Sequence, residues 1–335
     1  MLFWVAYFIG LTAFSLFATY RVLAVLKRRA IMDAPNERSN HDVPTPRGGG
    51  IAVMLTIALG WAILVGARPD LTTGLSVIIM ASAVLLATMS WVDDTRGLSA
   101  SVRLPVHLAA CALGVWALPG DGAVFQGLLP TEVDWVLSVL VWAGFLNFFN
   151  FMDGIDGITA VETTAVAGGL FLIAALLPAE SLPQAGLAAV AAAAVGFLFL
   201  NWSPARLFMG DVGSVPLGYL LGWFLLFLAA KGYWAPAVIL PAYYLADAGI
   251  TLIRRAARGE KVWQAHREHF YQRAVAAALD RGDERHVAHR RISAVIALLN
   301  AALVALAAWS LHAPVPALAL TVLSVGGTLW WMNRS

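Results

Sequence analysis

The chain passes repeatedly through stretches of about 20 apolar residues, the length that a helix needs to span a bilayer. This pattern limits the fold more than any other feature. Of the 335 residues, 60% are hydrophobic and only 13% are charged, whereas a soluble domain has ~45–50% apolar and ~25% charged residues. The sequence therefore predicts a polytopic membrane protein and excludes a water-soluble enzyme.

The apolar stretches are continuous, which favours helices over the alternating strands of a membrane barrel. We expect an all-α fold with about eleven transmembrane helices. We also expect one catalytic domain that covers residues 1–335. The apolar stretches are 3–26, 50–67, 73–92, 104–119, 133–150, 160–178, 185–201, 214–230, 233–253, 292–311 and 315–332.

Basic residues are concentrated in every second polar break. These breaks contain all but three of the 22 lysines and arginines. Because basic loops favour the cytoplasm, we expect the N-terminus outside and the C-terminus inside. We expect all of these loops except the last to form an active site. The breaks are 27–49, 93–103, 151–159, 202–213, 254–291 and 333–335.

Acidic residues gather in the same expected inner breaks. Asp93 and Asp94 end the third apolar stretch, and Asp211 lies in the motif FMGDVGS, whose glycines allow a tight turn. Carboxylates near membrane depth are costly and indicate function by default. The alternatives are two solvated loop acids at 93–94 and a helix cap at Asp211.

A denser polar motif, NFFNFMDGIDG, covers residues 147–157. On a helix, Asn147, Asn150 and Asp153 would share one face. We expect the glycines of the motif to break the helix and to expose backbone N–H groups that can bind phosphate. Capping by single Asn and Asp residues is the alternative, but it does not account for so many polar groups in eleven residues.

Asp93, Asp94, Asp153, Asp156 and Asp211 together place five carboxylates at one expected membrane face. Because unpaired carboxylates would repel one another, we expect a divalent cation among them. Mg²⁺ binds one or two carboxylates together with phosphate oxygens and water, and Mn²⁺ is the alternative. Phosphoryl transfer is the reaction class that most needs such a site.

Two inner breaks supply cationic and imidazole groups. The first is rich in proline and glycine and carries Arg38, His41 and Arg47. The second contains the motif HREHFYQR. If this motif is helical, His266 and His269 share a face that could bind a diphosphate. A zinc site is disfavoured because no third ligand lies nearby at the usual spacing.

Two polar residues lie inside apolar stretches. His107 follows Arg103 near the inner end of the fourth stretch, and a histidine that packs between helices is favoured there over a catalytic one. Asp247 lies about two turns before Arg254 and Arg255. An acid at that depth is a functional candidate, and pairing with an arginine explains it equally well.

Taken together, these motifs resemble the polyprenyl-phosphate N-acetylhexosamine-1-phosphate transferases, an integral membrane family also called glycosyltransferase family 4. The resemblance is strongest to the branch that starts O-antigen synthesis. The motifs that carry it are PNERSNH and PTPRGGG within 35–50, the acids at 93–94, NFFNFMDGIDG at 147–157, FMGDVGS at 208–214, Asp247, and HREHFYQR at 266–273.

The resemblance implies a Mg²⁺-dependent transfer of an N-acetyl-sugar 1-phosphate from a UDP-sugar to undecaprenyl phosphate, with release of UMP, in the bacterial inner membrane. It also implies a role for each matching residue. Asp93 and Asp94 resemble the catalytic pair; Asp211 and Asp94 the metal ligands; Asn147, Asn150, Asp153, Asp156, His266, Arg267 and His269 the nucleotide-sugar site; and Arg38, His41 and Arg47 the acceptor-phosphate site.

The chain departs from the family pattern in two places. Many members carry an acid or lysine shortly after the acid pair, where this chain has Thr95-Arg96-Gly97-Leu98. The His-x-x-His motif is sparser than the histidine cluster of the peptidoglycan enzyme, which argues against a muramoyl-pentapeptide substrate. The donor sugar, the glycan pathway and a homodimeric state are left open.

A secondary transporter is the competing interpretation. It would place ionisable groups near mid-membrane between inverted repeats, whereas the acids here lie at the ends of apolar stretches on one side, and no repeat is evident. The remaining basic residues favour membrane topology and lipid headgroups, so we expect no nucleic-acid partner.

Overall fold

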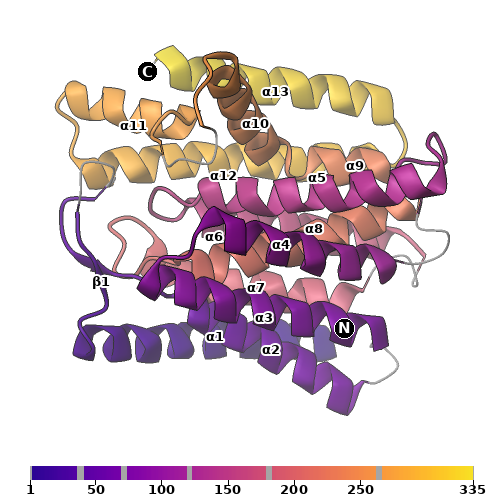
Figure 1. Cartoon of the computed structure of the whole chain (residues 1–335), viewed down its shortest axis with the longest axis horizontal. Helices are drawn as coiled ribbons and strands as arrows, with labels where there is room; N and C mark the ends of the chain where they lie inside the picture. The colour runs from indigo at the N-terminus through magenta and orange to yellow at the C-terminus, as the bar shows by residue number, and fades with distance from the viewer. Residues whose placement is uncertain are drawn as a thin grey trace.

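The computed structural model describes residues 2–35, 41–68, 74–118, 123–178, 183–261 and 266–334. This part of the chain is almost entirely helical, which confirms the all-α expectation (Figure 1). Its strands are β1 (Met32–Asp33) and β2 (Thr45–Pro46), which form one short antiparallel pair. The helices are α1 (Leu2–Arg28), α2 (Gly50–Ala67), α3 (Gly74–Arg96), α4 (Ala100–Trp116), α5 (Thr131–Phe151), α6 (Ile158–Leu176), α7 (Gln184–Asn201), α8 (Asp211–Ala230), α9 (Trp234–Ile239), α10 (Ala242–Ala257), α11 (Phe270–Asp280), α12 (Arg285–Trp309) and α13 (Pro314–Arg334).

Nine helices in the described part are long and apolar enough to cross a membrane, namely α1, α2, α3, α5, α6, α7, α8, α12 and α13. The fourth expected stretch is the shorter apolar helix α4. The ninth is divided at Pro241 into α9 and α10, because proline has no N–H for a continuous helix. The chain is thus a multi-pass membrane protein, and the count of about eleven spans and their orientation stay predictions.

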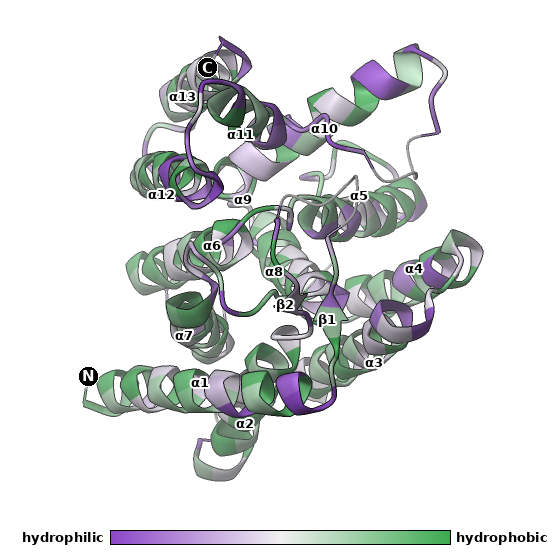
Figure 2. Ribbon diagram, turned by 90° about the vertical axis from the view of Figure 1, so that its left-hand side faces the viewer, coloured by the Kyte–Doolittle hydropathy of each residue, from purple (hydrophilic) through white to green (hydrophobic). Residues whose placement is uncertain are grey.

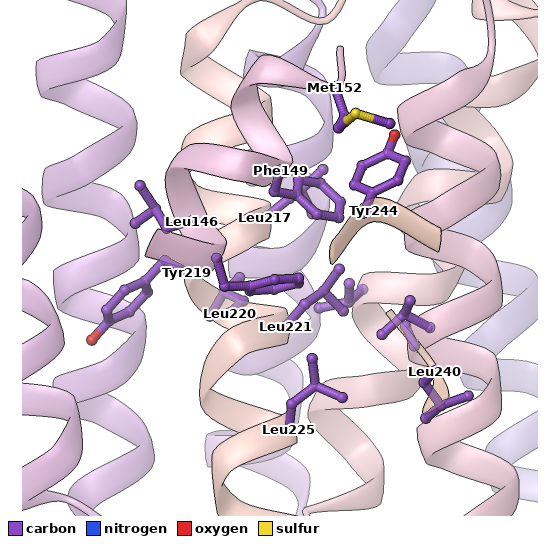
Figure 3. Packing of buried hydrophobic residues seen from close by; sticks show 14 of the residues in the cluster. Leu146, Phe149, Met152, Leu217, Tyr219, Leu220, Leu221, Leu225, Leu240 and Tyr244 are labelled. Carbon is purple, nitrogen blue, oxygen red and sulfur yellow. The ribbon is translucent and has the colours of Figure 1, made fainter. Parts of the chain in front are cut away.

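Helix α8 is the centre of the bundle. Almost all of its residues are buried, and it packs against α2, α3, α5, α6 and α9. Figure 3 shows Leu217 and Leu221 of this helix close to Phe149 of α5 and Tyr244 of α10. A helix that is apolar on all sides is typical of such a buried position. Its N-terminus, which begins with Asp211, is consequently held by packing on several sides.

The loop before α2 lies directly against the loop before α8. The N–H groups of Gly49 and Gly50 donate hydrogen bonds of 2.8 Å to the carbonyls of Phe208 and Met209. A Cβ atom on Gly50 would lie only 2.2 Å from the Cα atom of Gly213. Glycine is therefore required for this approach, which brings Arg47 next to the start of α8.

The expected inner loops meet at one end of the bundle, where α3, α5 and α10 end and α4 and α8 begin. We call it the site end. Figure 2 looks onto it and shows hydrophilic segments around β1, α10, α11 and the start of α12. Arg285 of α12 donates a 2.6 Å hydrogen bond to Asp42 in the first of these loops. Helix α1 begins, and α13 ends, at opposite ends of the bundle (Figure 1).

Candidate active site

Arg47 connects two of the expected acids. Its Nη2 atom lies 2.9 Å from Oδ1 of Asp94 and 2.7 Å from Oδ1 of Asp211. Although burial lowers it, the two carboxylates hold the pKa of Arg47 above its ordinary value. Residues that are far apart in the sequence are thereby joined into one charged cluster at the N-terminus of α8.

Asp94 binds the start of α8 directly. Its two carboxylate oxygens accept hydrogen bonds from the backbone N–H groups of Asp211, at 3.2 Å, and Val212, at 3.0 Å. A negative charge is favourable at a helix N-terminus because of the helix dipole and the free N–H groups there. Asp94, rather than Asp211 itself, therefore supplies the side-chain cap of this helix.

Asp93 faces the opposite side of the cluster. Its carboxylate accepts hydrogen bonds from the N–H of Leu98, at 2.6 Å, and from Nη1 of Arg103, at 2.7 Å. The same Arg103 nitrogen lies 3.8 Å from Oδ2 of Asp211. Asp211 is thus flanked by two guanidinium groups. Arg103 was not expected in the site, although it is a basic residue close behind the acid pair in the sequence.

A polar cavity of about 280 Å³ opens beside Asp211. Helices α3, α4, α5, α8 and α10 enclose it. Its polar lining consists of Ser90, Asp93, Arg103, His107, Asn147, Asn150 and Asp211. We call it the polar pocket.

The two expected asparagines both reach this pocket from α5. Asn150 donates a 3.4 Å hydrogen bond to Oδ2 of Asp211 and accepts one from the Ser214 hydroxyl. Asn147 donates to the carbonyl of Ala143 within its own helix, at 2.6 Å. The expected shared face is therefore present for the two asparagines, and Asn150 is tied directly to the acidic cluster. Asp153, expected on the same face, lies beyond the end of α5 at Phe151.

The acids of the DGIDG turn lie in different surroundings. Burial raises the pKa of Asp153 to about 6, against an opposing hydrogen bond from Thr159 and the charge of Arg47. Asp156 instead lies 3.3 Å from Nδ1 of His289 and accepts the N–H of Ala205. Although burial raises it, these contacts lower the pKa of Asp156.

The five expected carboxylates consequently divide into two groups. Asp93, Asp94 and Asp211 share two arginines at the start of α8, and Asp153 is near enough to feel Arg47 and Asp211 electrostatically. Asp156 ties the turn to α12 and to the loop before α8. We expected Asp156 to lie among the other four carboxylates, but its contacts are structural.

The histidine motif is not helical at its histidines, contrary to the conditional expectation. Helix α11 begins only at Phe270, and the rings of His266 and His269 lie 4.7 Å apart, tilted by 34°, in the segment before it. Burial lowers the pKa of His266 to about 4, so at neutral pH its ring offers hydrogen bonds without charge. Arg267, between the two histidines, is exposed.

The histidine segment lies next to the DGIDG turn. The Tyr271 hydroxyl donates a 3.5 Å hydrogen bond to the carbonyl of Phe151. A Cβ on Gly154 would lie only 2.1 Å from that hydroxyl. The two motifs are therefore in close contact, and a ligand bound by both is geometrically reasonable.

The acceptor residues expected in the first loop are only partly described. Arg38 lies outside the described residues. His41 packs against the ring of Phe208 at 4.9 Å, and its Nε2 atom lies 3.2 Å from the carbonyl oxygen of Asp33. These contacts of His41 hold the loop, and Arg47 is the residue of the described pair that reaches the acids.

The acidic cluster provides hard oxygen ligands, which are the type that Mg²⁺ prefers. No group of three or more His, Cys, Asp or Glu residues in the described ranges is spaced to hold a metal by itself. Both carboxylate oxygens of Asp94 accept hydrogen bonds from backbone N–H groups at the N-terminus of α8. The described hydrogen bonds to the carboxylate of Asp211 come from side chains, those of Arg47 and Asn150. These residues fit a cation that one or two carboxylates hold and that substrate phosphates and water complete.

A separate apolar cavity of about 510 Å³ lies further towards the other end of the bundle. Both cavities are lined by α5, α8 and α10. On α5, Trp142 and Phe145 line the apolar cavity and Asn147 and Asn150 the polar one, and α10 contributes Leu245 to the first and Leu252 to the second. We call the larger cavity the apolar groove.

Fold and site together define a class: an integral membrane protein with a polar pocket that contains carboxylates and an arginine, and with an apolar groove lined by the same helices α5, α8 and α10. Residues 76–229 match the family model described as glycosyl transferase family 4. This match and the relatives described below support the resemblance to the polyprenyl-phosphate N-acetylhexosamine-1-phosphate transferases.

Three relatives illustrate the relationship. A Bacillus subtilis (strain 168) protein named "Probable undecaprenyl-phosphate N-acetylglucosaminyl 1-phosphate transferase" is 27% identical, with 79% of this chain and 76% of the relative covered. A Mycobacterium tuberculosis (strain CDC 1551 / Oshkosh) decaprenyl-phosphate N-acetylglucosaminephosphotransferase is 30% identical, with 64% and 58% covered. A phospho-N-acetylmuramoyl-pentapeptide-transferase of Desulfatibacillum aliphaticivorans is 32% identical, with 53% and 58% covered. The chain thus spans less than two thirds of the length of the last two.

Proposed function

We propose that this protein transfers an N-acetyl-sugar 1-phosphate from a UDP-sugar to a polyprenyl phosphate, forming a polyprenyl-diphospho-sugar and UMP. The observation that carries the proposal is the position of Asp211, which is flanked by Arg47 and Arg103 and borders a polar pocket. The helices α5, α8 and α10 line both this pocket and the apolar groove. Such a reaction would start O-antigen or another cell-envelope polysaccharide at the cytoplasmic membrane. The relatives, which are named as transferases acting on polyprenyl phosphates, support this class of substrates.

The arrangement of the two cavities suits an acceptor with a charged head and a long apolar tail. The phosphate of the lipid would lie in the polar pocket near Arg103, and its chain would follow α5 and α8 into the apolar groove. Trp142 and Phe145 offer the groove apolar surface whose burial against a prenyl chain is favourable. A soluble phosphate acceptor would make no use of this groove.

In the proposed reaction, an acceptor phosphate oxygen forms a bond to the β-phosphorus of the UDP-sugar. The bond from that phosphorus to the oxygen bridging the two phosphates breaks, and UMP leaves with that oxygen. A phosphomonoester has a second pKa near ~6 and is largely ionised at neutral pH. We therefore assign Asp93 and Asp94 to positioning and charge balance, because the nucleophile scarcely needs a general base.

The donor would approach from the side of the DGIDG turn and the histidine segment. Asn150 and Asp153 offer amide and carboxylate groups to the nucleotide sugar. His266 and His269 offer imidazole nitrogens to its diphosphate. Asp211, with a second carboxylate, would hold Mg²⁺ or Mn²⁺ together with substrate phosphate oxygens. When bound, this ion would offset negative charge on the transferring group.

Product analysis tests this function. Purified full-length protein with Mg²⁺, undecaprenyl phosphate and a panel of UDP-N-acetyl sugars should release UMP, and omission of the lipid should stop the release. The panel also identifies the donor. Release of UDP in place of UMP would mean glycosyl transfer and would overturn the phosphoryl mechanism.

A further inference from the structure

His107 is a buried histidine that the proposed reaction has not used. It lies on α4 with 3% of its surface exposed, and neither of its ring nitrogens has a hydrogen-bond partner among the described residues. The Asn147 amide is close to the ring and can satisfy at most one of the two nitrogens. Burying a polar group without a hydrogen-bond partner costs free energy. We therefore expect a ligand to supply a partner for this ring.

The ring borders the polar pocket. Arg103 and His107 are four residues apart on α4 and therefore lie on the same helix face, ~6 Å apart along the axis. Arg103 is at the site end, next to Asp93 and Asp211, so His107 lies one turn deeper in the bundle. A group bound by both side chains must extend from the acidic cluster towards the membrane interior.

The head of a lipid phosphate has this shape and direction. The charged oxygens of this phosphate can contact Arg103, and the side of the phosphate nearer the prenyl chain can face His107. The prenyl chain can then extend towards the apolar groove. A neutral imidazole always carries one N–H donor, which suits a phosphate oxygen in a pocket that already contains two carboxylates.

We propose that His107 binds the phosphate of the lipid acceptor from its membrane side and is a specificity-determining residue for that acceptor. This inference rests on the proposed function for its choice of ligand. The sequence alone favours a histidine that packs between helices. A packing role, however, does not require an unpaired ring nitrogen at the wall of a pocket.

Binding and kinetics of full-length variants test the inference. H107L removes both nitrogens, and H107Q keeps a donor and an acceptor. C111A, one turn further along the same helix and fully buried, is the matched packing control. We expect H107L to weaken undecaprenyl phosphate binding, measured by native mass spectrometry, about tenfold or more. H107Q and C111A should remain within about threefold of the wild type.

Undecaprenol, which lacks the phosphate, should bind equally to the wild type and H107L. In turnover assays, H107L should raise the KM for undecaprenyl phosphate and leave the KM for the UDP-sugar within about twofold. Equal binding of undecaprenyl phosphate by wild type and H107L, or no binding by either, overturns the inference. Wild-type protein that binds the lipid phosphate through His107 but releases no UMP would contradict the proposed function alone.

Discussion

Nδ1 of His269 lies 3.1 Å from Oδ1 of Asp247, which joins the histidine segment to the middle of α10. Asp247 also accepts hydrogen bonds from the backbone N–H groups of Phe270, at 3.0 Å, and Tyr271, at 3.3 Å. This fully buried carboxylate thus both caps α11 and orients the His269 ring. The hydrogen bond fixes which face of the imidazole is turned towards a ligand.

Replacing Asp247 by Asn should therefore weaken donor binding without affecting the acceptor. The amide keeps the size of the side chain but weakens the hydrogen bond to the imidazole and to one N–H of α11. We expect the KM for the UDP-sugar to rise about tenfold, the effect of a charged hydrogen bond of ~1.5 kcal/mol. Steady-state kinetics with each substrate varied in turn measure both constants.

Asp134→Asn is the matched control for this variant. Asp134 is also buried and also accepts two backbone N–H groups, those of Val124 and Phe125. It lies near the opposite end of α5 from the site. If Asp134→Asn raises the donor KM as much as Asp247→Asn does, the effect of Asp247 is one of general stability.

Asp94 and Asp211 should differ in what their loss does to the protein. Asp94→Asn removes carboxylate charge from the N-terminus of α8, which should lower the free energy of unfolding by ~1–2 kcal/mol. Asp211→Asn should leave the thermal stability near that of the wild type and abolish turnover. Thermal unfolding in detergent and UMP release measure the two effects. Substantial Mg²⁺-dependent turnover by Asp211→Asn would remove Asp211 from the proposed metal site.

The sequence predicts the membrane fold well because apolar stretches of this length have few alternatives. It also marks the residues that meet at the start of α8, because polar groups near membrane depth require a reason. The division between α9 and α10 was less visible, since Pro241 lies inside a continuous apolar stretch that includes Pro236 as well. Only the packing of the bundle decides which proline ends a helix.

Side-chain partners between distant segments could not be predicted. Periodicity places Asp247 on a helix, but the sequence does not show whether its carboxylate pairs with a nearby arginine or with His269. Asp156 shares its motif with Asp153 but is held by His289 of α12, more than 130 residues away. Such pairs depend on which helix ends become neighbours, and the sequence pattern of a single helix does not contain that information.

The raised pKa of Asp153 predicts a pH dependence of donor binding. With a pKa of about 6, this carboxyl group is protonated at pH 5 and ionised at pH 7.5. If the ionised form accepts hydrogen bonds from the nucleotide sugar, the Kd for the donor, measured without acceptor, should fall as the pH rises through 6. Leaving out the acceptor removes the phosphomonoester, which titrates in the same range. Asp153→Asn should bind weakly and without this dependence. An unchanged pH profile in the variant would show that another group titrates.

Contact between the DGIDG turn and α11 can be tested at Gly154. A Cβ there would lie 2.1 Å from the Tyr271 hydroxyl, so Gly154→Ala must push α11, and with it the histidine segment, away from the turn. We expect kcat/KM for the donor to fall at least about tenfold, because misplacement of binding groups by ~1 Å can cost a hundredfold. Gly168→Ala in α6, with nothing within 4 Å of its added Cβ, should be neutral. Full donor kcat/KM in Gly154→Ala would mean that the segment binds no donor in this position.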